Sequence, residues 1–100
     1  MNQIDVLQWR AGYVLRIPIS MLPQSLPRYI QLTCNDKVVK ARLLKYVVNY
    51  AYYRVYARYV QTLLELSELL KDGGVCVVEY YDYDHDQIHK TYTNSLYLNT

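Results

Sequence analysis

The stretch from Asp36 to Asp72 contains neither glycine nor proline, and this constrains the fold more than any other feature of the chain. Both residues interrupt regular structure, so an uninterrupted run of this length favours a helix. Apolar side chains recur every four positions, in the row Val39, Leu43, Val47, Ala51, Val55, Tyr59 and Leu63. Such spacing is typical of one helix face, and Gly73-Gly74 offers a natural end. The pattern predicts one long helix over residues 36–72.

The local composition in the middle of this stretch points the other way. Residues 46–60 are rich in tyrosine and valine, which prefer pleated surfaces. A strand covering that segment would be longer than the usual upper limit of about 10 residues. We therefore expect the helix rather than a strand.

The predicted helix is apolar on two opposite sides, which favours packing on both. At 1.5 Å per residue it would be a rod of roughly 50 Å and would project beyond a compact chain of this size. We expect the projecting apolar surface to be buried against a second copy, because a soluble protein rarely leaves such a patch bare. The predicted dimer interface consists of Leu43, Tyr46, Val47, Tyr50 and Tyr53.

The segments on either side of the predicted helix read as strands. Residues 3–10 and 13–19 flank Ala11-Gly12, a tight-turn signal, and form a predicted hairpin. Residues 75–98 form a second predicted hairpin with its tip at 84–87, a register that places Asp82 opposite His89. The expected fold class is therefore α+β: residues 1–100 form a single domain in which an antiparallel sheet of two hairpins packs on one long central helix.

The second hairpin tip carries the densest polar cluster in the sequence, comprising Asp82, Asp84, His85, Asp86 and His89. Carboxylate and imidazole groups can bind a divalent metal, but aspartate is also favoured in turns because it bonds nearby backbone. No known metal-binding spacing is present. We interpret the cluster as a solvated turn with an Asp82–His89 cross-strand pair, and predict no metal site.

The remaining chemistry of the sequence points away from catalysis. Cys34 and Cys76 have no base partner in the sequence and are expected to be reduced, buried thiols, although two cysteines also permit one disulfide between them. No phosphate loop, dinucleotide motif or serine elbow is present. We predict no catalytic residue, cofactor or small-molecule substrate. Without a signal peptide or membrane segment, we expect an intracellular, cytoplasmic protein that is not secreted.

Charge is distributed unevenly along the chain. Residues 1–60 hold nine Lys or Arg against two acids, a balance of +7, whereas residues 61–100 have a balance of −5. Such asymmetry suggests nucleic acid or self-association, unless the two halves neutralise each other within the fold. Cations between exposed tyrosines suit phosphate contacts and base stacking. The predicted nucleic-acid-binding residues are Lys37, Lys40, Arg42, Lys45, Arg54 and Arg58.

Two functional hypotheses follow. The first is a small non-enzymatic homodimeric binding protein that binds nucleic acid through the basic face of the central helix. The alternative is a structural or adaptor protein, such as a viral accessory or virion component, that binds other proteins through its tyrosine-rich surface. The composition, with 13 tyrosines and no phenylalanine, looks like that of small proteins from hyperthermophilic archaea and their viruses.

Overall fold

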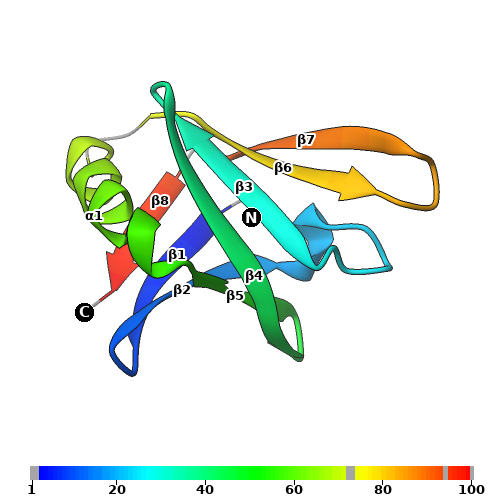
Figure 1. The fold of residues 1–100 in the computed structure, drawn as a ribbon, viewed down its shortest axis with the longest axis horizontal. Coiled ribbons are helices and arrows are strands. Elements are labelled where there is room, and N and C mark those ends of the chain that lie inside the picture. The colour runs from blue at the N-terminus through cyan, green and yellow to red at the C-terminus, as the bar shows by residue number, and fades with distance from the viewer. Residues whose placement is uncertain (1–2, 72–73, 94, 100) are drawn as a thin grey trace.

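A computed structural model of the chain describes residues 3–71, 74–93 and 95–99. Within these ranges, eight strands form one sheet with the order β7-β6-β3-β4-β5-β2-β1-β8 (Figure 1). The strands are β1 (Gln3–Trp9), β2 (Gly12–Pro18), β3 (Tyr29–Cys34), β4 (Lys37–Val47), β5 (Tyr50–Val55), β6 (Cys76–Asp82), β7 (Gln87–Thr93) and β8 (Ser95–Asn99). Neighbouring strands are antiparallel except β1 and β8, which run parallel.

The predicted long central helix is wrong. Most of that stretch forms the β4–β5 hairpin, followed by the 3-10 turn η2 (Ala57–Tyr59) and the helix α1 (Val60–Leu69). A spacing of four is a multiple of two, so a row repeating every fourth residue also lies on one face of a strand. Val39 and Ala41 of β4 are buried in this way. Helical spacing of buried residues begins only at Leu63. The predicted end of the helix at Asp72 lies outside the described residues.

The sequence pattern does not indicate the β4–β5 hairpin because its turn contains an unusual residue. Val48 adopts a φ of 56°, a conformation that β-branched residues rarely take and that hairpin turns normally give to glycine or asparagine. The chain therefore reverses direction where the sequence carries no glycine. A register shift between Leu43 and Lys45 adds a bulge to β4, which lets an eleven-residue strand bend.

The hydrophobic core lies between the inward face of the bent sheet and α1. Ile4, Leu15, Leu32 and Val78 come from four different strands, and all are fully buried. Leu63, Leu66 and Leu70 are buried on the side of the helical segment that faces them. One helix of ten residues thus covers the sheet, which makes this a small, compact domain of sheet and helix.

The hairpin predicted at residues 3–19 is present as β1–β2, whereas the second hairpin has a different register. Asp82 is opposite Gln87 rather than His89, so the predicted pairing is wrong by two residues. The chain does not continue as one return strand after β7. Residues 95–99 instead form β8 and pair in parallel with β1. In Figure 1 the β6–β7 hairpin extends away from the rest of the sheet, on the side opposite α1.

Cys34 and Cys76 are joined by a disulfide, which corrects the expectation of reduced thiols. They are opposed residues of the adjacent strands β3 and β6, with Cα atoms 4.5 Å apart. Disulfides are typical of oxidising compartments and also of intracellular proteins from hyperthermophiles. The cytoplasmic location expected from the sequence therefore stays a prediction.

The overall dimensions leave no room for the projecting rod on which the predicted dimer depended. The molecule measures 35 × 27 × 26 Å, and its longest extent is well below the roughly 50 Å of the expected helix. Over the part of the chain that the structure covers, no helix has the length and apolarity needed to cross a membrane.

Candidate functional site

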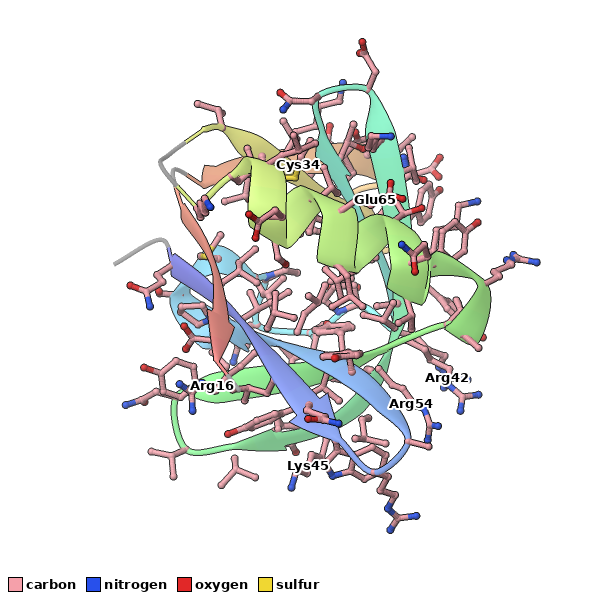
Figure 2. All side chains as sticks on the ribbon, turned by 90° about the vertical axis from the view of Figure 1, so that its left-hand side faces the viewer. Arg16, Cys34, Arg42, Lys45, Arg54 and Glu65 are labelled. Atoms are coloured by element: carbon pink, nitrogen blue, oxygen red, sulfur yellow. A yellow bond between two sulfur atoms is a disulfide. The ribbon has the colours of Figure 1, made fainter. Side chains whose placement is uncertain are left out.

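The structure brings four of the six predicted nucleic-acid-binding cations to the outer face of the β4–β5 hairpin. Arg42 and Arg54 are directly opposite each other, and Lys45 is opposite Tyr52. Lys40 lies on the same face of β4, because it alternates with buried Val39 and Ala41. Figure 2 shows Arg42 and Arg54 close together, with Lys45 further along the same side of the molecule.

The other two predicted cations lie elsewhere. Arg58 is in η2 and stacks on the ring of Tyr59 at 5.1 Å. Lys37 is opposite Cys34 and forms a salt bridge of 3.7 Å with Glu65 of α1. The basic residues therefore divide into an outer group and two outliers.

Trp9 and Arg10, which were not predicted from the sequence, complete this surface. Trp9 lies on the outer face at the end of β1, with the Arg10 guanidinium 4.5 Å and the Arg54 guanidinium 5.3 Å from its ring. Lys45 lies 5.2 Å from the ring of Tyr52 in the same way. Cations and aromatic rings thus alternate across three strands and a turn. We refer to Trp9, Arg10, Arg42, Lys45, Tyr52 and Arg54 together as the cation–aromatic face.

Within the described part of the chain, the cations of this face have no acidic partner. None of the salt bridges found among the described residues involves Arg10, Arg42, Lys45 or Arg54. Arg16 on the neighbouring strand β2 does have an acidic partner. Its guanidinium contacts buried Asp5 at 2.6 Å, and this hydrogen bond raises the pKa of Arg16. The charge of Arg16 is therefore compensated, while the charges of the cation–aromatic face remain available.

Two open hollows adjoin the cation–aromatic face and share Tyr56. One, of about 410 Å³, is lined by Arg42 and Arg54 together with Gly12. The other, of about 440 Å³, is lined by Lys40 and by the rings of Tyr29 and Tyr81. The surface beyond Arg42 is thus hollowed and aromatic rather than flat.

The residues of the predicted dimer interface do not share one surface. Tyr53 is completely buried and donates a hydrogen bond of 2.6 Å to the carbonyl of Pro27. Leu43 is half-buried against the core. Tyr46, Val47 and Tyr50 are exposed on either side of the β4–β5 turn. In the folded chain only these three of the five are accessible to a partner.

The tip of the β6–β7 hairpin brings three predicted polar residues together. Asp82 Oδ2 lies 2.8 Å from His85 Nδ1 and 3.0 Å from His89 Nε2. The hydrogen bond between Asp82 and His85 raises the pKa of His85 and lowers the pKa of Asp82. The predicted turn chemistry is also present, because Asp82 Oδ1 accepts hydrogen bonds from the backbone N–H groups of Asp84 and His85. The expected Asp82–His89 contact exists despite the register error, because a shift of two residues keeps a side chain on the same face.

Comparisons of this chain with protein-family models, with curated proteins and with solved structures found no match.

Proposed function

We propose that this protein is a non-enzymatic binding protein for single-stranded nucleic acid, with the cation–aromatic face as its binding surface. The observation that carries the proposal is the pairing of Arg42 with Arg54 beside Trp9. Two like charges directly opposite each other destabilise a sheet. An anionic ligand that binds between them therefore reduces the electrostatic repulsion present in the free protein. The phosphate backbone of a nucleic acid is such a ligand.

Phosphate contacts supply most of the affinity in this proposal. Arg10, Arg42, Lys45 and Arg54 have exposed side chains without an acidic partner among the described residues. Each phosphate neutralised on a single strand adds about 0.7 to the steepness of log K against log salt. Four contacts give a slope of roughly −2.8, which predicts binding that is measurable at low salt and weak at high salt.

The aromatic rings favour a single strand over a duplex. An unpaired base can stack on the ring of Trp9 or Tyr52, and each stacked base contributes about 1–3 kcal/mol. In a duplex the bases are stacked inside the helix, so only its phosphates can contact the cation–aromatic face. Because every base has an aromatic surface, we expect tolerance of sequence with a preference for flexible single strands.

The position of Trp9 provides a direct assay, since it is the only tryptophan in the chain. Titration with a thymidine decamer at low salt should quench Trp9 fluorescence and saturate at one strand per face. A duplex of the same length should bind more weakly and quench less. Absence of any change in fluorescence, together with no retention on a single-stranded DNA column, would contradict the proposal.

A second candidate, an adaptor or structural protein that associates through its apolar surface, is favoured by the β4–β5 turn. Tyr46 and Val48 are 66% and 82% exposed, and Val47 lies between them, also exposed. A self-associating protein would show a mass of twice 11.9 kDa in light scattering at micromolar concentration. Val48→Ser with Tyr46→Ser should return that mass to the monomer value. A monomer mass for the unmodified protein would rule out self-association through this turn and leave the nucleic-acid proposal standing.

A further inference from the structure

Three potential metal ligands converge at the tip of the β6–β7 hairpin, away from the cation–aromatic face. The imidazoles of His85 and His89 both point at one carboxylate oxygen of Asp82. The ligand atoms of the three residues all lie within 4.8 Å of one another. Their burial differs, because the side chain of Asp82 is only 9% exposed whereas that of His85 is 71% exposed. The group is therefore anchored on its protein side and open to solvent on the other.

The surrounding contacts hold two of the three side chains in place. The second carboxylate oxygen of Asp82 accepts the N–H groups of residues 84 and 85, so the turn itself fixes the carboxylate. The ring of His89 stacks on the ring of Tyr80, with centroids 5.6 Å apart and planes inclined by 12°. Groups that orient a ligating histidine and carboxylate are a regular part of metal sites in proteins. Gln87 Nε2 also lies 3.0 Å from His89 Nε2, so an ion shared by Asp82 Oδ2 and the two imidazole nitrogens replaces this contact and the hydrogen bonds among the three side chains.

We propose that Asp82 Oδ2, His85 Nδ1 and His89 Nε2 bind one divalent transition-metal ion of the Zn²⁺ type. Two imidazoles with one carboxylate suit zinc and its neighbours, whereas Mg²⁺ and Ca²⁺ prefer sites made entirely of oxygen atoms. Ligands at about 2.0–2.2 Å in a tetrahedral centre lie about 3.3 Å apart, so only small movements are needed from the present distances. Water completes the coordination on the exposed side.

The charge of the turn favours a cation. Asp84 and Asp86 are exposed in the same turn and add two carboxylates to that of Asp82. Among the salt bridges of the described residues, those at this tip join Asp82 only to the two histidines. Lys90 is opposite Glu79 on the other face of the hairpin and does not compensate these acids. On ion binding, the proton held in the Asp82–His85 hydrogen bond passes to solvent, so each divalent ion raises the net charge of the turn by one.

Bound metal would join the end of β6, the turn and β7 at one point. The β6–β7 hairpin extends from the sheet, and β7 is an edge strand of the sheet formed by the described residues (Figure 1). Binding to the folded hairpin and not to an open one stabilises the folded form. Metal binding does not depend on nucleic-acid binding, because Asp82 and His89 lie on a different hairpin from the cation–aromatic face and on the opposite face of the sheet.

The test uses the full chain without a purification tag, with the disulfide intact and without thiol reagents. Competition of Zn²⁺ with a chromophoric chelator should show one site per chain. His85→Ala and His89→Ala should each weaken that site at least about tenfold. These are the only two histidines in the chain, so no other imidazole can replace them. NMR signals of both rings should shift together as Zn²⁺ is added, and Mg²⁺ should not compete.

Asp86→Asn is the matched control for Asp82→Asn, because both remove one carboxylate from the same hairpin end. The control should keep the affinity for Zn²⁺ within a few-fold, while Asp82→Asn should weaken it as the histidine variants do. Far-UV circular dichroism shows whether each variant keeps its fold. Equal weakening by Asp86→Asn and His85→Ala would mean diffuse attraction of ions rather than a site. Unchanged Zn²⁺ affinity in the double histidine variant would equally overturn the proposal.

Discussion

Arg42 and Arg54 lie directly opposite each other on β4 and β5, two positive side chains in a location where neighbouring strands usually place complementary groups. No salt bridge among the described residues relieves the pair. Surface positions that lower stability are common where a protein binds a ligand, because function can favour an arrangement that folding does not. Substitutions of Arg42 or Arg54 should therefore change both the stability of the free protein and its affinity for an anionic ligand.

Arg42→Thr should make the free protein more stable. The substitution removes the repulsion and places a β-branched residue in a strand, so we expect a gain of up to about 1 kcal/mol in the free energy of unfolding. Urea unfolding at low salt measures it. Lys40→Thr, on the same strand but opposite Gln31, is the control and should change stability less. A loss of stability in Arg42→Thr would show that the two arginines are not in conflict.

Val48→Gly distinguishes the hairpin from the helix that the sequence pattern favours. In the hairpin, glycine relieves a residue held at positive φ, which gives a gain of about 1 kcal/mol. In the interior of a helix the same change would cost about 1 kcal/mol. The sign of the shift in thermal unfolding is thus decisive, and a destabilised variant would contradict the β4–β5 turn.

Tyr53→Phe should change the response of stability to alkaline pH. Burial raises the pKa of Tyr53 above its ordinary value of 10.0, so the native phenol stays protonated where the unfolded one ionises. Stability is therefore complete below about pH 10 and falls above it, by up to about 1.4 kcal/mol per pH unit for this group.

The same variant loses the hydrogen bond to Pro27 and should be less stable at neutral pH by about 1–2 kcal/mol. Between about pH 9 and 11 the difference between the two proteins should narrow by about 1.4 kcal/mol. Urea unfolding across this range follows it. A constant difference would mean that Tyr53 ionises as readily in the folded chain as in the unfolded one.

Some elements could be predicted from the sequence because their signals are local. Ala11-Gly12 marks the first hairpin, and the polar run after Asp82 marks the turn of the last one. The β4–β5 hairpin has only Asn49 as a turn residue, because its position of positive φ is occupied by Val48, whose side chain disfavours that conformation. Spacing by fours then described strand and helix equally well, and the preference of tyrosine and valine for strands was the better indicator.

The candidate site shows the same division. The sequence identifies Arg42 and Arg54 as candidate binding residues. That they are opposite each other follows from the register of the β4–β5 hairpin, which a helix prediction cannot include. Trp9 joins them only through the pairing of β2 with β5, a contact between distant parts of the chain. The sequence shows that Asp82, His85 and His89 lie near one another along the chain. Only the geometry of the turn shows that their ligand atoms point to one place.

The salt dependence of single-strand binding tests the central claim most directly. Arg42→Gln with Arg54→Gln removes two cations from the cation–aromatic face. The matched control, Lys37→Gln with Lys71→Gln, removes two cations that pair with acids of α1. Affinity for a fluorescent thymidine decamer is measured by anisotropy from low to physiological salt. The first variant should flatten the plot of log K against log salt by about 1.4, and the control should leave the slope unchanged. Equal flattening in both variants, or no binding by the unmodified protein at low salt, would contradict the account.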